Sequence, residues 1–382
     1  EPWACVERAY ATKERGALKA GGDLLVVVDQ GHAIEGLAEL IEASRPTAIT
    51  ACGTDDAQQE LLEDFGAALA HCPDVLESGS FDDIIYFGAD PERVEQLQTL
   101  LRLGGVIDVV LGGQRLGRPV EIDVGRVHYD LLRWVGTTGS SAADGYAWVP
   151  RSAELRPNER VGVIGAAGPM GFMHVVRALS MGVEGVSVTA VDIDEERLAH
   201  LAGVATPLAQ ERGLAFEAVD SKTSEVSGSF TRIGCMVPVP SLAAGTVDLA
   251  GEGCIIDFFA GFAVGTTAPL DLDQMLERHV YIIGTSGSMI SDMKAVLARL
   301  EAGALDTNIS VYAISGMQGA ADALEAVKAR TSGGKIVIYP QLTQLGLVTL
   351  AELPERMPQV AAQLEDGRWT RSAEAALLEA YG

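Results

Sequence analysis

The sequence predicts an α/β protein with two tandem Rossmann-like, doubly wound parallel-sheet domains and a C-terminal α+β segment. Three observations predict this fold: short apolar runs alternate with helical patterns, the whole series occurs twice, and the second series contains a glycine-rich turn. Strands that form continuous apolar runs, rather than alternating ones, are typical of parallel sheets covered by helices on both faces. Repeated strand–helix alternation predicts the doubly wound architecture.

Composition narrows the possible functions. The 382 residues contain 28 Lys and Arg against 53 Asp and Glu, a formal charge of −25, which argues against binding to nucleic acid or to an anionic membrane surface. No charge-free apolar run reaches the ~18 residues of a membrane span, and no secretory signal is present. Five scattered cysteines indicate a reduced, cytoplasmic protein without a disulfide scaffold. Because the chain starts at Glu1 and not at Met, we expect it to be a fragment.

The first series defines a first Rossmann region, residues 18–150. Its expected strands are the apolar runs 24–28, 48–52, 84–87, 105–111 and 132–136. A helical pattern follows the first run, with Ile34, Leu37, Leu40 and Ile41 spaced for one helix face.

A second Rossmann region, residues 151–289, repeats these features. Four segments match between the regions: 18–24 with 155–161, 81–84 with 230–233, 118–123 with 267–272, and 134–140 with 282–288. The matching Gly-Thr-Thr/Ser-Gly-Ser sequences at 136–140 and 284–288 favour an internal duplication. The alternative is that two unrelated α/β domains look alike because both are rich in Val and Gly.

The second region contains the pattern of a dinucleotide-binding turn. After the strand at 161–164, Gly165 permits a tight turn, Gly168 lets the backbone approach a diphosphate, and Gly171 lets the following helix pack closely on the sheet. The next strand, 186–191, ends at Asp192, where a carboxylate is expected to bind the adenosine ribose hydroxyls. The alternative is a Rossmann-shaped domain that binds nothing.

The first region lacks this pattern. Asp29 takes the place of the tight-turn glycine, and Glu35 lies near the expected phosphate charge. A carboxylate there repels a diphosphate and competes for the same N–H groups. We therefore predict that the first region is a structural or assembly domain.

Four motifs together resemble the zinc-type medium-chain alcohol/polyol dehydrogenases, most closely their sorbose-phosphate-reductase-like branch. They are Glu-Pro-Trp-Ala-Cys-Val at 1–6, Gly-Pro-Met-Gly-Phe-Met-His at 168–174, Gly-Thr-Ser-Gly-Ser at 284–288 and Gly-Lys-Ile-Val-Ile-Tyr-Pro at 334–340. The resemblance implies that residues 1–17 end a GroES-like catalytic domain and that residues 290–382 return to it.

The resemblance also implies a catalytic zinc, whose family ligands, a Cys and a His-Glu pair, lie upstream of the Glu-Pro motif. We therefore expect zinc only with a missing N-terminal portion, and no metal site in this chain. Glu1 resembles a family carboxylate near the zinc, and other catalytic residues are unknown. His71 and Cys72 are adjacent, but no further residue has metal-ligand spacing to them.

These expectations define an NAD(P)-dependent dehydrogenase that moves hydride between an alcohol or polyol, possibly phosphorylated, and nicotinamide. NAD is preferred because Asp192 would repel the 2′-phosphate of NADP. The predicted cofactor contacts are Gly165, Ala166, Gly168, Pro169, Met170, Gly171, Asp192, Ile193, Val237, Pro238, Gly261, Thr285, Ser286 and Gly287.

The alternative function is a regulatory or assembly protein that binds NAD without chemistry. For assembly, we predict a pseudo-dimer of the two Rossmann regions inside each chain, in which strands 131–135 and 280–283 pair with each other. The alternative is that each edge pairs with another subunit of a homo-oligomer.

Overall fold

The computed structural model describes residues 1–53, 55–70, 76–329 and 331–382. They form two compact units. Unit 1 contains residues 1–7, 163–226 and 289–382, and unit 2 contains residues 8–162 and 227–288. The predicted regions 18–150 and 151–289 each contain one sheet and do not coincide with these units, so their boundaries stay a prediction.

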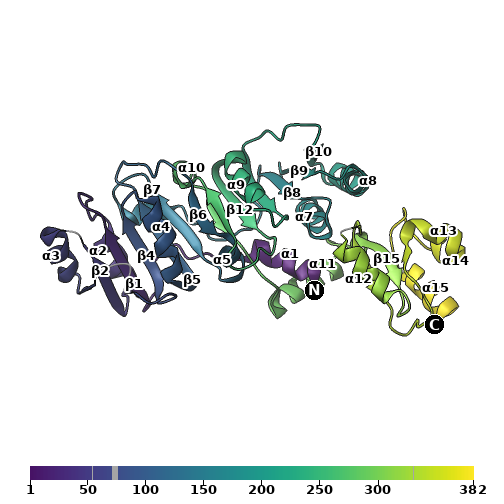
Figure 1. The fold of residues 1–382 in the computed structure, drawn as a ribbon. Helices are drawn as coiled ribbons and strands as arrows, with labels where there is room; N and C mark the ends of the chain where they lie inside the picture. Colours follow the sequence, from purple (N-terminus) through teal and green to yellow (C-terminus); the bar gives the residue numbers. More distant parts are fainter. Residues whose placement is uncertain (54, 71–75, 330) are drawn as a thin grey trace. The chain divides into compact units, whose positions relative to one another are not determined.

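Unit 2 contains the whole first sheet, with strand order β3-β2-β1-β4-β5-β7 and parallel pairing throughout (Figure 1). Its strands are β1 (Asp23–Val28), β2 (Ala48–Cys52), β3 (Ala68–Leu69), β4 (Phe81–Phe87), β5 (Leu101–Val110) and β7 (Arg133–Thr137). Its helices are α2 (Leu37–Ser44), α3 (Asp56–Asp64), α4 (Pro91–Leu97), α5 (Val124–Tyr129) and α6 (Ala142–Ala147). The first four expected strands are confirmed to within a few residues, and the run 132–136 corresponds to β7.

The second sheet has the order β10-β9-β8-β11-β12-β14. Counted within each sheet along the chain, its strands are arranged in the same order as those of the first sheet. Its strands are β8 (Arg160–Ile164), β9 (Ser187–Asp192), β10 (Ala215–Asp220), β11 (Phe230–Cys235), β12 (Ala250–Phe258) and β14 (Tyr281–Ile283). The helices are α7 (Pro169–Ser180), α8 (Glu195–Arg212), α9 (Pro240–Leu249) and α10 (Leu272–Glu277). The prediction of two doubly wound parallel sheets is confirmed.

Inside unit 2 the two Rossmann regions join through a different pair of strands from the predicted one. β6 (Val120–Asp123) and β13 (Thr267–Leu270) pair antiparallel as a two-stranded sheet. The predicted pairing of 131–135 with 280–283 is wrong, since β7 and β14 belong to separate sheets. These two edges meet through side chains: Val135, Tyr281 and Ile283 share one buried apolar cluster.

Helices explain why the two edge strands do not pair. A Cβ on Gly284, just after β14, would lie 2.7 Å from the carbonyl oxygen of Val127 in α5. A Cβ on Gly136 in β7 would lie 2.8 Å from Leu276 Cδ2 in α10. A helix of each region thus occupies the space beside the other region's edge strand.

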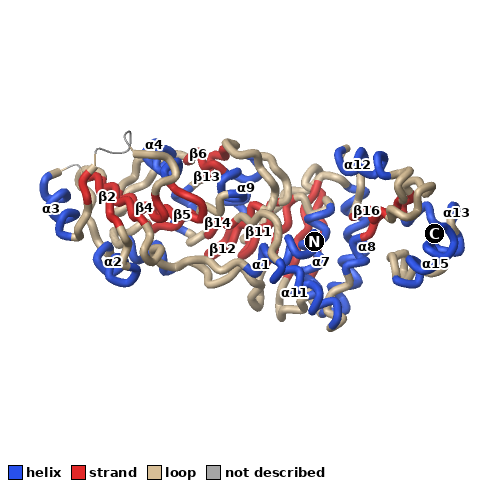
Figure 2. Tube along the Cα trace, turned by 90° about the horizontal axis from the view of Figure 1, so that it is seen from below, coloured by secondary structure: helices blue, strands red, loops and turns tan. Residues whose placement is uncertain are grey.

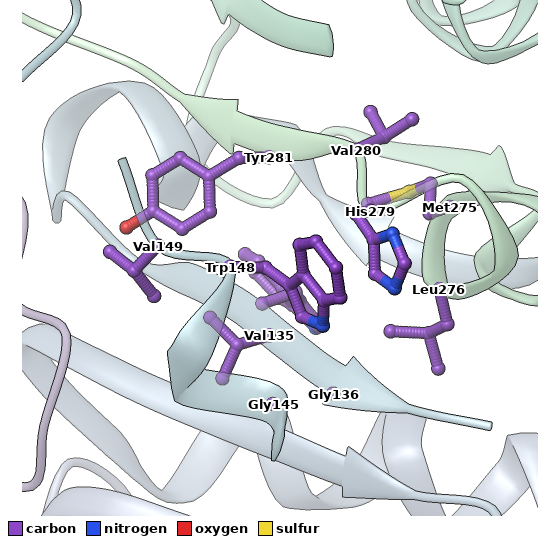
Figure 3. Close-up of a pocket in the computed structure, with 11 residues that line it drawn as sticks. Val135, Gly136, Gly145, Trp148, Val149, Met275, Leu276, His279, Val280 and Tyr281 are labelled. Atoms are coloured by element: carbon purple, nitrogen blue, oxygen red, sulfur yellow. The ribbon is translucent and has the colours of Figure 1, made fainter. Parts of the chain in front are cut away.

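A small cavity lies on the same seam (Figure 3). It is lined by Val135 and Gly136 from β7, by Trp148, and by His279 and Tyr281 from the second region. Trp148 stacks on His279 with ring centroids 3.3 Å apart. The cavity has a volume of about 20 Å³, which suits a single water molecule and not a larger ligand.

The C-terminal segment in unit 1 forms its own layer, as the sequence predicts. It contains α11 (Ile290–Glu301), β15 (Val311–Ser315), α12 (Ala320–Lys328), β16 (Lys335–Ile338), β17 (Val348–Thr349), α13 (Leu353–Arg356), α14 (Pro358–Ala361) and α15 (Arg371–Tyr381). The three strands form a separate sheet in the order β16-β15-β17. Ile314, Trp369 and Leu377 belong to the apolar core beneath it. The predicted C-terminal α+β segment is confirmed.

The prediction of a fully reduced protein does not hold at one cysteine. Cys52, at the end of β2, is disulfide-bonded, whereas Cys235 and Cys254 are free thiols. Within the described ranges, no helix combines the length and apolar character needed to span a membrane.

Candidate functional site

The glycine turn in unit 1 has the geometry that its sequence predicts. Gly165 has φ of 81°, a left-handed conformation that an L side chain resists, and its N–H donates to Val191 O at 2.8 Å. A Cβ on Gly171 would lie 2.7 Å from Ala166 Cα and still closer to the Gly165 carbonyl oxygen. Only glycine therefore lets α7 begin this close to the turn. With Pro169 at its first position, α7 presents unpaired N–H groups, which favour an anion.

Asp192, at the end of β9, is bonded to the turn. It is buried, its Oδ2 accepts a hydrogen bond from Ala167 N at 2.8 Å, and its Oδ1 accepts from Ile193 N at 2.8 Å. Oδ1 also accepts from Asp194 N at 3.1 Å, so Oδ2 is the oxygen that keeps a lone pair for a further donor. Asp192 therefore fixes the shape of the turn besides its predicted contact with a ribose. Ile193 beside it is 58% exposed and offers an apolar surface.

Carboxylates dominate the surroundings of Asp192. Asp194 caps α8, and the backbone N–H and side chain of Arg197 lower the pKa of its carboxyl. Asp220 ends β10, the strand paired with β9 in register with Asp192. Lys222 is an exposed cation nearby. The prediction that NAD is preferred to NADP depends on this balance of charge.

Sequence reasoning missed one residue beside the turn. The Lys335 ammonium, on β16, lies 3.5 Å from Met170 Sδ in the first turn of α7. Burial lowers the pKa of Lys335, while the nearby Cys5 and Glu1 act in the opposite direction. A cation at the start of α7 suits a bound diphosphate. No spacing in the sequence predicts it, because 165 positions separate the two side chains.

Glu1 and Glu7 occupy the N-terminal part of unit 1. Glu1 precedes α1 (Pro2–Ala11) and accepts a 3.4 Å hydrogen bond from Cys5 Sγ. Glu7 is buried and accepts from Arg177 of α7 at 3.2 Å and from Arg299 of α11 at 2.6 Å. The start of α1 accordingly lies beside α7 and α11 (Figure 2). This network fixes the N-terminal helix against the helix that follows the glycine turn.

The remaining predicted contacts belong to unit 2, where each follows the carboxyl end of a parallel strand. Val237 and Pro238 follow β11, Gly261 follows β12, and residues 285–287 follow β14. Carboxyl ends of strands are where doubly wound sheets bind ligands. The Thr285 hydroxyl is buried and has no hydrogen-bond partner among the described residues. A buried polar atom without a partner is uncommon, and a ligand is one explanation.

The corresponding end of the first sheet is filled by its own side chains. The Tyr86 hydroxyl donates to Asp29 Oδ2 and accepts from Asp90 N at 3.0 Å. Burial and the Asp29 carboxylate raise the pKa of Tyr86. Gln58 Nε2 donates to the carbonyls of Asp29 and His32. This arrangement supports the prediction that a diphosphate is excluded here.

Two buried acids occupy equivalent strands. Asp257 on β12 is fully buried, and burial raises its pKa to about 7 although Arg232 and Arg133 oppose the shift. Asp108 on β5 has neither carboxyl oxygen hydrogen-bonded among the described residues, and burial, with Asp83 and Asp144 nearby, raises its pKa well above the usual range.

The zinc implied by the resemblance does not fit the residues present. Across the residues that the structure describes, no group of three or more His, Cys, Asp or Glu side chains is placed to hold a metal ion. His71 and Cys72 lie outside the described residues. We therefore derive no step through a metal.

Known proteins with similar sequences include three bacterial ones. The chain is 26% identical over 248 residues to the uncharacterized protein YggP of Escherichia coli K12, covering 60% of this chain and 58% of that protein. It is 26% identical over 252 residues to mannitol-1-phosphate 5-dehydrogenase of Aliivibrio fischeri, covering 59% and 58%. It is 27% identical over 234 residues to L-sorbose 1-phosphate reductase of Klebsiella pneumoniae, covering 59% and 56%. The aligned part thus spans less than two thirds of each relative, and no family model matches the chain.

Similar solved structures include acetophenone reductase from Geotrichum candidum in complex with NAD, which is 20% identical with a TM-score of 0.38 over 49% of this chain and 50% of that one. Benzyl alcohol dehydrogenase from Acinetobacter calcoaceticus is 20% identical with a TM-score of 0.40 over 48% and 50%.

Proposed function

We propose that the chain is a nicotinamide-dependent oxidoreductase of the polyol dehydrogenase superfamily, to which its similar sequences belong. The observation that carries this proposal is the glycine turn with Asp192 bonded to it. Similarity to a mannitol-1-phosphate dehydrogenase and a sorbose 1-phosphate reductase supports a polyol or sugar substrate, including a phosphorylated one.

In this proposal the residues of the chain bind and orient a dinucleotide. The N–H groups at the start of α7 and the Lys335 ammonium hold the diphosphate, and Asp192 accepts hydrogen bonds from the adenosine ribose. Nicotinamide supplies hydride transfer when bound. Within unit 2, the residues after β11, β12 and β14, including the Thr285 hydroxyl, are proposed as contacts of a nicotinamide group.

NAD is the proposed cofactor, in preference to NADP. Asp192, Asp194 and Asp220 place negative charge where a 2′-phosphate would lie. The first Rossmann region is proposed to bind no dinucleotide, because Tyr86 and Asp29 occupy its strand ends. The equal strand order of the two sheets supports the proposal that the regions arose by duplication.

The test is a titration of NADH and NADPH, followed by fluorescence or calorimetry. Gly168→Asp places a carboxylate at the diphosphate position, where a Cβ has room because its nearest neighbour is 3.7 Å away. We expect NADH affinity to fall at least tenfold, since like charges meet at the helix start. His32→Asp, at the equivalent position of the first region, is the matched control and should change nothing. If the wild type binds neither nucleotide, the proposal is refuted.

A further inference from the structure

The seam between the Rossmann regions in unit 2 has nearly two-fold symmetry. Asp123 and Asp271 each cap a helix by accepting a hydrogen bond from the backbone N–H three residues ahead. Equivalent residues of the two regions therefore differ by 148 in number. In the register of β6 and β13, Val120 faces Leu270 and Ile122 faces Ala268. Exchanging each residue for its equivalent turns one of these facing pairs into the other.

The axis of this symmetry passes between Glu121 and Pro269, which face each other. Glu121 N donates away from β13, to Glu95 Oε1 at 3.0 Å. At this point of the register, the strands therefore pair without an N–H group directed at the opposite strand. Proline, which has no N–H group, is accepted at 269 for this reason.

The symmetry brings helix α5 of the first region to the strand ends of the second. His128 Nδ1 is 3.0 Å from the carbonyl oxygen of Phe258, the last residue of β12. The same His128 backbone lies against Gly284, 2.8 Å from the position of a Cβ. The next residue, Tyr129, has its hydroxyl 2.9 Å from the position that a Cβ on Gly261 would take.

A second contact across the seam fixes the end of β14. Arg133 of β7 is buried, forms a 2.8 Å ion pair with Glu14, and donates through Nη2 to Gly284 O at 3.3 Å. Tyr281 OH donates to the same Glu14 at 2.8 Å. The first region thus holds the backbone directly before Thr285.

The strand ends themselves break the symmetry. In the first region, Thr137 Oγ1 accepts a hydrogen bond from Gly139 N at 3.0 Å, and Gly112 N closes the turn by donating to Gly139 O at 2.8 Å. The equivalent Thr285 hydroxyl of the second region has no partner among the described residues and is buried. Tyr129 is 45% exposed, whereas its equivalent, Glu277, forms an ion pair with Arg115.

We propose that the first Rossmann region completes the cofactor site of the second, with the Tyr129 hydroxyl hydrogen-bonded to a polar group in the nicotinamide half of the dinucleotide. This inference rests on the proposed function, because it takes Gly261 and Thr285 as cofactor contacts. Tyr129 lies beside Gly261, which follows β12, and the preceding His128 lies against Gly284, which follows β14. Two strand ends of the second region and helix α5 of the first therefore converge there. The first region then has a role in binding although it binds no dinucleotide alone.

The test is an NADH titration of the full chain with Tyr129→Phe and Tyr129→Ala, accompanied by thermal unfolding. Loss of one hydrogen bond should weaken NADH binding roughly threefold to tenfold in the Phe variant. The unfolding temperature should stay unchanged, since the side chain is half exposed. The matched control is Glu277→Gln at the symmetry-equivalent position, which should leave the affinity unchanged.

The outcomes separate the two proposals. If the wild type binds no NADH or NADPH, the proposed function fails and this inference with it. If the wild type binds NADH and both Tyr129 variants bind equally well, only the inference fails. A loss of affinity equal in Tyr129→Phe and Glu277→Gln would also refute it, because the effect would not be specific to the second strand end.

Discussion

Asp257→Asn should change how stability depends on pH. Asp257 lies fully buried on β12 with a pKa of about 7, against 3.8 for an ordinary aspartate. Because the folded pKa is raised, the folded protein keeps a proton that the unfolded chain has already released between these values. Stability from the protonated carboxyl is fully present below pH 3.8 and is lost as pH rises toward 7.

The size of the effect follows from the shift. Each pH unit between the two pKa values costs the wild type about 1.4 kcal/mol, and Asn does not titrate. Between pH 5 and pH 7, the variant should therefore gain about 2 kcal/mol relative to the wild type, since the slope falls off where the folded carboxyl is half ionised near pH 7. The assay is urea unfolding of both proteins at pH 5, 6, 7 and 8, with the difference in unfolding free energy plotted against pH.

A difference that does not vary with pH would refute the reasoning. It would mean that Arg133 and Arg232 keep the Asp257 carboxyl ionised in the folded protein despite its burial. Asp108→Asn is the parallel measurement in the first region, and it should change with pH in the same direction, because burial raises that pKa too. Because wild type and variant differ at one residue, the contributions of the other titrating groups cancel in the difference of their unfolding free energies. This requires that both proteins unfold in two states.

Two further predictions concern the glycine turn. Asp192→Ala should weaken NADH binding without creating NADPH binding, because it removes the hydrogen-bond acceptor of Ala167 N as well as the charge that repels a 2′-phosphate. Titration of both nucleotides checks this prediction. An NADPH affinity that rises to the NADH level would contradict it. Gly171→Ala should lower the unfolding free energy by about 1–3 kcal/mol, since its Cβ collides with the Gly165–Ala166 backbone, whereas an unchanged denaturation midpoint would show that α7 can move away.

Local features of the chain were predictable from the sequence. The strands follow continuous apolar runs, and the turn at Gly165 needs a left-handed residue, so both depend on neighbouring positions. The β6–β13 pair was not predictable, because β6 has only four residues and its partner lies about 150 positions away. Lys335 belongs to the motif at 334–340 and Tyr129 to none, but the place of each side chain in a site was missed because it comes from long-range contacts made by the fold.

Asp192 shows a subtler limit. Its spacing from Gly171 predicts a ribose contact, but the hydrogen bond to Ala167 N depends on how β9 lies beside the turn. The sequence therefore predicts the ribose contact but not the hydrogen bond that holds the turn. The wrong pairing of 131–135 with 280–283 has a similar origin, because apolar edge strands predict that an edge is covered but do not show whether a strand or a helix covers it.

The differences between the two Rossmann regions are confined to places where packing permits them. Gly136 and Gly284 are both glycine, since each lies against a helix of the other region, and a side chain at either position would separate the seam. Asp29 takes the place of Gly165 at a strand end, where Tyr86 and solvent accommodate a carboxylate. A carboxylate at this strand end leaves the seam unchanged, because the seam contacts lie elsewhere. Under the proposed function, the first region can therefore lack a dinucleotide of its own and still place Tyr129 and Arg133 beside the strand ends of the other region.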